Sequence, residues 1–122
     1  MEHVKRTERG WAGHFICADR CKFRRNTLLE YKDVKIVVST VGLMVVDGKF
    51  EEIGYNRYFE TKAFHVDKSD TRWFDADVSR EIKFQSEWSI SEIDADDKAN
   101  EMHENVVDEL TSKLINGYKF EN

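Results

Sequence analysis

Chemically active side chains are concentrated in residues 10–25, GWAGHFICADRCKFRR. Zinc sites usually contain two closely spaced pairs of ligands. This segment offers only one irregularly spaced group, His14, Cys17 and Cys21, so we expect no metal site. We interpret Cys17 as a small buried hydrophobe and His14 as a hydrogen-bonded strand residue. A disulfide between Cys17 and Cys21 is possible across a turn, but a cytosolic setting disfavours it.

Arginines that lie close to aromatic residues form a second pattern. Aromatic rings stack on nucleobases and guanidinium groups bind phosphate in bidentate fashion, so this pattern is typical of a nucleotide site. A charged sheet face over an aromatic core would have the same composition, and this alternative stays open. The candidate ligand-binding residues are Arg24, Arg25, Arg57, Tyr55, Trp11 and Trp73.

Two polar residues of the expected C-terminal helix, Asn100 and His103, complete the candidate set. They lie three positions apart beside an apolar stripe. There an amide could bond to the edge of a base, and an imidazole could donate to a phosphate. A solvent-facing or capping role fits the same positions.

The sequence contains no recognisable catalytic motif. It has no glycine loop for phosphate, no G-x-S-x-G and no H-E-x-x-H. Asp75 and Asp77 could share a strand face and act as acid and base, but a solvated loop is the simpler interpretation. We therefore expect a binding protein without a cofactor rather than an enzyme.

Charge is distributed unevenly along the 122 residues, which we expect to form one domain. The net charge of −5 combines +3 in residues 1–33, −2 in residues 34–90 and −6 in residues 91–122. The acidic total argues against a protein that coats duplex DNA, but it permits one small anion in a basic pocket. No membrane span or signal peptide is recognisable, so we expect a cytoplasmic protein.

Residues 1–93 have the composition of a β-rich core. The run 34–46 is nearly all apolar, so we expect burial on both faces, or on one face plus a contact with a second copy. Lys32-Asp33 suits a hairpin turn, and Asp47-Gly48 is the strongest turn signal because Asp-Gly accepts positive φ. Apolar composition or alternation predicts further strand segments over residues 10–18, 26–31, 53–66, 72–84 and 87–93.

A single helix is expected over residues 94–117. Asp94 is the predicted cap, and Asn116-Gly117 is a stop signal. The predicted architecture is α+β, with an antiparallel β-sheet of four to six strands followed by one long C-terminal α-helix. Because one helix cannot cover a large sheet, we expect a homo-oligomer. The apolar stripe of the helix comprises Ala95, Ala99, Met102, Val106, Leu110 and Leu114.

Several segments resemble a family of short phage-encoded proteins. The resemblance covers nearly the whole chain, through residues 35–42, 53–61, 75–82 and 94–103. The family is similar to the Thoeris anti-defence proteins, small phage proteins with an antiparallel β core and a C-terminal helix. Its most specific segments are RGWAGHFICADRC, residues 9–21, and FRRNTLLEY, residues 23–31.

This resemblance implies a function. Such proteins assemble from dimers and sequester a cyclic nucleotide immune signal, either a cyclic ADP-ribose isomer or a cyclic oligonucleotide, without cleaving it. It also implies a location in the cytoplasm of the infected bacterial host. The alternative is an anti-CRISPR-like inhibitor that binds a host nuclease complex. Its acidic helix would mimic nucleic-acid phosphates through Asp96, Asp97, Glu101, Glu104 and Asp108.

Overall fold

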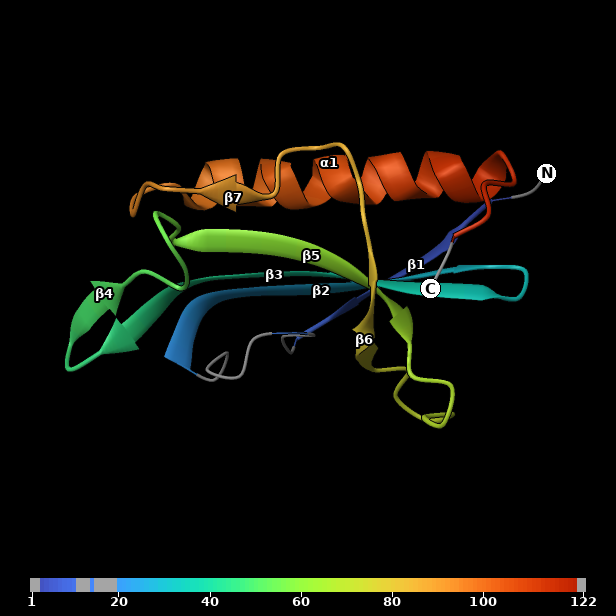
Figure 1. Cartoon of the computed structure of the whole chain (residues 1–122), viewed down its shortest axis with the longest axis horizontal. Helices are drawn as coiled ribbons and strands as arrows, with labels where there is room; N and C mark the ends of the chain where they lie inside the picture. Colours follow the sequence, from blue (N-terminus) through green and yellow to red (C-terminus); the bar gives the residue numbers. More distant parts are fainter. Residues whose placement is uncertain (1–2, 11–13, 15–19, 121–122) are drawn as a thin grey trace.

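A computed structural model describes residues 3–10, 14 and 20–120 of the chain. The described part consists of one antiparallel sheet with a long helix across one face (Figure 1). Its elements are β1 Lys5–Arg9, β2 Cys21–Tyr31, β3 Val34–Val46, β4 Lys49–Glu51, β5 Phe59–Val66, β6 Ala76–Ile82, β7 Ser89–Ile90 and α1 Asp96–Ile115.

The strand order is β1-β2-β3-β5-β6, while β4 pairs with β3 and β7 pairs with β5. This arrangement confirms the α+β class and the C-terminal position of the helix. The described residues form seven strands, more than the expected four to six, and two of them, β1 and β4, lie outside the predicted strand segments. The polar strand β1 had no apolar pattern to reveal it, and it pairs with β2 along its whole length.

Both predicted hairpin turns are confirmed. Lys32-Asp33 joins β2 to β3, and Asp47-Gly48 joins β3 to β4 with φ values of 51° and 76°. The strand expected from residue 53 was wrong at its start, since β5 begins at Phe59. Residues 54–57 instead form a tight turn with Asn56 at φ 55°, because Asn tolerates the left-handed conformation.

The helix begins and ends close to the predicted residues. Its N-cap is Ala95, without a side-chain cap bond, so the capping role expected for Asp94 was wrong. Ala95 is itself buried, in a cluster with Phe59 and Met102. The predicted stop is confirmed, since Asn116 is the C-cap and Gly117 follows with φ 75°.

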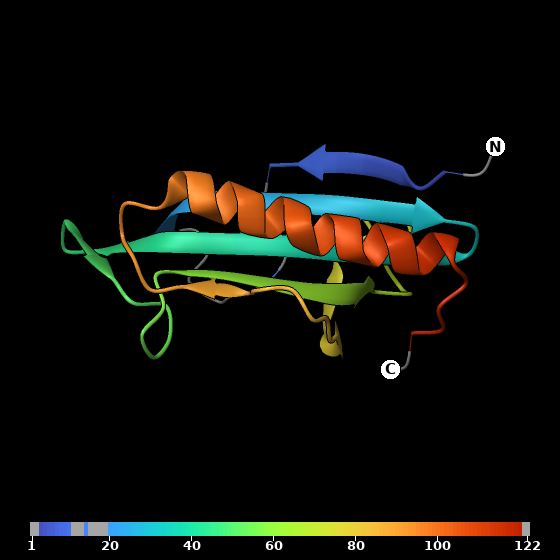
Figure 2. The ribbon, with the colours of Figure 1, turned by 90° about the horizontal axis from the view of Figure 1, so that it is seen from above.

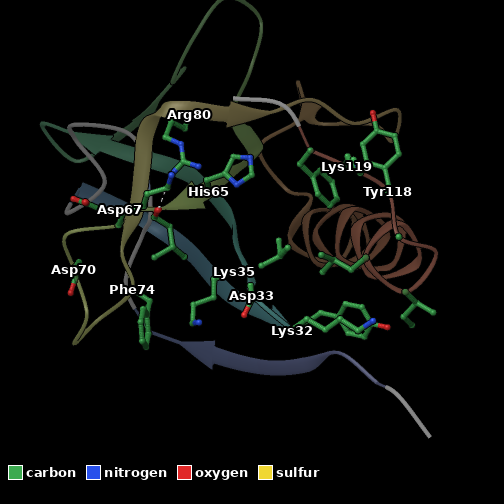
Figure 3. A pocket seen from close by; sticks show the side chains of 18 of the residues that line it. Lys32, Asp33, Lys35, His65, Asp67, Asp70, Phe74, Arg80, Tyr118 and Lys119 are labelled. Atoms are coloured by element: carbon green, nitrogen blue, oxygen red, sulfur yellow. Dashed lines mark hydrogen bonds between the residues drawn. The ribbon is translucent and has the colours of Figure 1, made fainter.

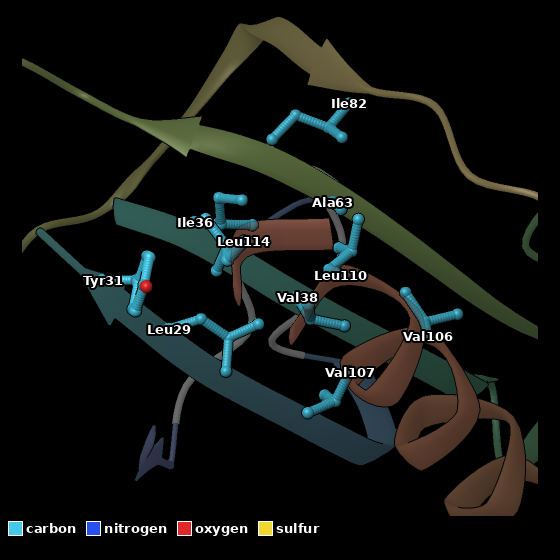
Figure 4. Close-up of a cluster of buried hydrophobic side chains, with 10 residues drawn as sticks. All are labelled: Leu29, Tyr31, Ile36, Val38, Ala63, Ile82, Val106, Val107, Leu110 and Leu114. Atoms are coloured by element: carbon cyan, nitrogen blue, oxygen red, sulfur yellow. The ribbon is translucent and has the colours of Figure 1, made fainter. Parts of the chain in front are cut away.

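The helix packs lengthwise on β2, β3 and β5 (Figure 2). Each buried aliphatic side chain at this interface contributes about 1.5–3 kcal/mol relative to exposure, so the interface supplies much of the folding free energy. Its larger cluster, drawn in Figure 4, contains Leu29, Tyr31, Ile36, Val38, Ala63, Ile82, Val106, Val107, Leu110 and Leu114.

A second cluster lies under the N-terminal half of the helix, around Phe59. Gly42 is opposite Phe59 in the β3–β5 register, and a Cβ at Gly42 would collide with the Phe59 ring. The glycine inside the apolar run is therefore required by this aromatic side chain. Phe23 closes the cluster with an edge-on contact to Phe59 at 5.5 Å between ring centroids.

The sheet face opposite the helix, which we call the far face, is also buried along β3. Val37, Ser39 and Val41 all have no exposed surface. Val37 packs with side chains that include Phe74, from the loop after β5. The expected burial of both faces is thus observed for the central residues 36–43, whereas Val34, Lys35 and residues 44–46 are partly exposed.

Candidate functional site

A pocket of about 690 Å³ lies where the sheet, the loop after β5 and the end of the helix meet. We call it the end pocket. Its volume falls within the usual range for small-molecule sites. Figure 3 shows Phe74 on one side and Tyr118 and Lys119 on the other, with Lys35 and Asp33 of the β2–β3 hairpin between them.

The end pocket combines positive charge with aromatic rings. Four rings contribute to its lining, those of Tyr31, Phe74, Tyr118 and Phe120. Guanidinium and ammonium groups neutralise phosphate, and aromatic faces stack on bases. The basic lining residues are Lys32, Lys35, Lys68, Arg80, Lys119 and the imidazole of His65.

Three aspartates also line this pocket, but two of them are engaged by their own loop. Asp67 accepts bonds from the backbone N–H and hydroxyl of Ser69 at 2.9 and 2.7 Å. Asp70 accepts bonds from the backbone N–H groups of Trp73 and Arg72 at 2.8 and 3.1 Å. The Trp73 N–H is the main cause that lowers the pKa of Asp70. The third aspartate, Asp33, lies on the hairpin. The lining thus contains five Lys/Arg residues and three carboxylates, so positive charge is in excess.

The predicted arginines do not converge on this pocket. Arg24 and Arg25 are neighbours on β2 and so point to opposite faces of the sheet. Arg24 is exposed. Arg25 forms ion pairs with Glu104 at 2.9 Å and with Glu8 at 3.1 Å. Arg57 lies over the Trp88 ring, with its guanidinium carbon 5.1 Å from the ring centroid.

The predicted aromatic and helical residues are similarly scattered. Tyr55 is 93% exposed on the turn before β5. Trp73 is exposed in the loop after β5, beside the pocket-lining Phe74. Asn100 is exposed on the helix. Trp11 lies outside the described residues. Of the predicted residues that the structure describes, none lines the end pocket.

His103 lies in the core, with no exposed surface. Its Nε2 and Nδ1 atoms each lie 2.7 Å from a hydroxyl, those of Thr27 and Thr40 respectively. Burial, followed by the charge of Arg25, lowers the pKa of His103 to about 4. Both ring nitrogens are occupied by the protein, so this imidazole stabilises the helix–sheet interface and offers no atom to a ligand.

A second buried histidine, His14, lies on the far face. Its Nδ1 atom is 2.8 Å from the Ser39 hydroxyl, and its Nε2 atom is 3.7 Å from a Glu60 carboxylate oxygen. The order serine, histidine, acid is that of hydrolytic triads. The hydroxyl of Ser39 is fully buried on a central strand, however, so a substrate carbonyl has no approach to it.

Cationic side chains surround Glu60, which is 5% exposed. Lys62 and Arg57 each lie 3.8 Å from its Oε1 atom. Burial alone would raise the pKa of Glu60, but the neighbouring His14, Lys62 and Arg57 outweigh burial and lower it. Glu60 is therefore ionised, and it neutralises the charge of the neighbouring Lys62 and Arg57 on the far face.

Cys21 is buried in a small cluster with Val41 and Ile53. Cys17 lies outside the described residues, so the structure leaves a Cys17–Cys21 pairing untested. Within residues 3–10, 14 and 20–120, no group of three His, Cys, Asp or Glu side chains is arranged to hold a metal ion. No helix in this part of the chain is long and apolar enough to cross a membrane.

The residues that line the end pocket were not predicted, because the sequence segments that contain them are short. The hairpin segment YKDVK places Lys32 and Lys35 around a turn, and the segment GYKF after the helix combines Lys119 with two rings. Each segment alone is an ordinary turn. Only the sheet register and the end of the helix bring the two to one place.

Comparisons with known proteins add no relative: no protein-family model matches the chain, and no curated protein or solved structure matches it significantly.

Proposed function

We propose that this protein binds a small nucleotide-type anion in the end pocket and holds it without chemical change. One observation carries the proposal: a pocket of about 690 Å³ is lined by five Lys/Arg residues and four aromatic rings. Lysine and arginine side chains balance phosphate charge, while rings hold a base. The acidic net charge of the chain is compatible with this, because the positive groups are concentrated locally.

The biological role that we propose follows from the resemblance of the sequence to phage anti-defence proteins. The ligand is then a cyclic nucleotide immune signal, and the protein acts in the cytoplasm of the infected bacterial host. A protein that removes a signal must hold it below its signalling concentration. Nanomolar affinity, about −12 kcal/mol, is therefore needed. A homo-oligomer would raise the number of sites per particle.

The test is a retention experiment. The purified protein is incubated with a panel of cyclic ADP-ribose isomers and cyclic di- and trinucleotides, and then separated by filtration. The retained fraction is heated, and both fractions are chromatographed. We expect one compound to vanish from the filtrate and to return intact on heating. New products would indicate an enzyme instead.

Two variants locate the binding site. Lys32→Gln removes a pocket cation and should weaken binding at least about tenfold, since one charge-assisted contact is worth about 1.5–3 kcal/mol. Lys98→Gln removes an exposed helix cation that pairs with Glu92, far from the pocket lining, and should leave binding unchanged. Equal affinities of both variants and the wild type would exclude the end pocket.

The alternative is a protein-binding inhibitor. Asp96, Asp97, Glu101 and Asp108 are exposed on the helix, whereas Glu104 is paired with Arg6 and Arg25. If every compound of the panel stays in the filtrate, the nucleotide proposal fails. The exposed acidic face then becomes the surface to test against host nuclease complexes.

A further inference from the structure

The loop 67–75 holds Phe74 in an unusual backbone conformation. Its φ is 53°, in the left-handed region that bulky side chains rarely adopt. Strained positions persist where surrounding contacts enforce them, and they are concentrated at functional sites. Phe74 is also a wall of the end pocket.

Two side chains enforce this conformation. Asp70 accepts the backbone N–H groups of Arg72, Trp73 and Asp75 at 3.1, 2.8 and 3.2 Å. From the other side, the Nη1 atom of Arg9 donates to the carbonyl oxygens of Trp73 and Phe74, the latter at 3.1 Å. The loop is therefore held through its backbone on both sides of the strained residue.

Arg9 is itself anchored to the sheet. It is the last residue of β1 and lies opposite Asn26 in the β1–β2 register. Its Nε atom donates to Oδ1 of Asn26 at 2.8 Å, and Asn26 has no exposed surface. The guanidinium thus connects a rigid strand to the loop, although Arg9 does not line the pocket.

The Phe74 ring is placed to receive a planar group. Its inner side packs with Leu28, Val37 and Val66 of the far face. The Lys35 ammonium lies 5.2 Å from its centroid, and both residues line the pocket. A stacked base would take the place of this ammonium over the ring, and the released ammonium could then bind the phosphate of the same ligand.

We propose that Phe74 is the platform on which the end pocket stacks a planar ring of its ligand, and that Arg9 is the positioning residue that fixes this platform. The proposal rests on the proposed function, and it identifies the ligand as a phosphate compound with a planar base.

The test compares two probes, adenosine 5′-monophosphate and ribose 5-phosphate, the second of which carries a hydroxyl group in place of adenine. Calorimetric titration of the wild-type protein should show roughly tenfold or tighter binding of the nucleotide, since stacking of one base accounts for a factor of this size. Phe74→Leu keeps an apolar side chain on the core but removes the π face. It should bring the two affinities to within about threefold and leave ribose 5-phosphate binding intact.

Arg9→Gln should reduce the same affinity ratio, although Arg9 does not line the pocket. Arg72→Gln is the matched control, because the Arg72 guanidinium lies over the exposed Trp73 ring 4.8 Å from its centroid. Hydrogen–deuterium exchange of residues 72–75 provides a readout without any ligand. Exchange should accelerate in Arg9→Gln and stay unchanged in Arg72→Gln.

Each outcome is decisive. Equal wild-type affinity for the two probes overturns the platform while the proposed function stands. A ratio or an exchange rate that Arg9→Gln does not alter overturns the positioning role of Arg9. Failure of both probes to bind overturns the platform and contradicts the proposed function, whereas the exchange result still shows whether Arg9 fixes the loop.

Discussion

The two faces of the sheet each bury a histidine, and the two side chains contact consecutive residues of β3. On the helix side, His103 bonds to Thr40 at 2.7 Å. On the far face, His14 bonds to Ser39 at 2.8 Å. The first imidazole has a hydroxyl at each ring nitrogen. The second has one hydroxyl and a carboxylate at 3.7 Å, beyond hydrogen-bond distance.

This contrast separates a packing role from a polar one. Both ring nitrogens of His103 lie 2.7 Å from a threonine hydroxyl, and its lowered pKa keeps the imidazole neutral, so it acts as a core side chain. Around His14 the neighbours include ionised Glu60, with Arg57 and Lys62 close by. The same residue type therefore acts through shape and hydroxyl bonds on one face and among charges on the other.

The largest expected effect is on the helix side. His103→Ala should lower the free energy of unfolding by about 3 kcal/mol or more, because it leaves a cavity and two buried hydroxyls without their partner. Urea denaturation at pH 7 measures this. A loss below about 1 kcal/mol would show that the interface does not depend on this imidazole.

The stability of the protein should depend on pH through His103. The folded-state pKa of His103 is about 4, below its usual value of 6.5, so the unfolded chain binds the proton first as pH falls. Its contribution is fully present above pH 6.5. About 2 kcal/mol of it should be lost between pH 7 and pH 5. Urea titrations should show this loss in the wild type but not in His103→Gln.

Removal of the far-face carboxylate should cost less. Glu60→Gln leaves Arg57 and Lys62 without a neutralising charge, but their distances of 3.8 Å are long. We expect a loss of about 1 kcal/mol in unfolding free energy. Glu81→Gln, which removes a more exposed partner of Lys62, serves as the control. If Glu60→Gln instead stabilised the protein, the conclusion that Glu60 stabilises the fold by neutralising Arg57 and Lys62 would be wrong.

The smallest effect is expected on β2. Arg24→Ala removes an exposed side chain, so the free energy of unfolding should change by less than about 0.5 kcal/mol. Thermal unfolding measures this change. Arg25→Ala removes the partner of Glu104 and Glu8 and should cost more. Equal losses for these two neighbours would contradict their assignment to opposite faces.

Local patterns determined most of the elements. The apolar residues spaced three or four positions apart from Ala95 to Leu114 determined the helix, and Asp47-Gly48 determined a hairpin, because both signals act within a few residues. The α+β class followed from these signals. The strand β1 did not, since its five residues carry no apolar side chain and are held in place by pairing with β2.

The site was decided by tertiary structure. The sequence placed His103 beside the apolar stripe, but only the position of the helix over β2 and β3 puts it between Thr27 and Thr40. Likewise, Arg24 and Arg25 are a basic pair in the sequence, and the alternation of a strand sends them to opposite faces. Lys35, Phe74 and Lys119 share a pocket because the register of the sheet and the end of the helix bring distant segments together. Such long-range placement depends on packing, which no local pattern encodes.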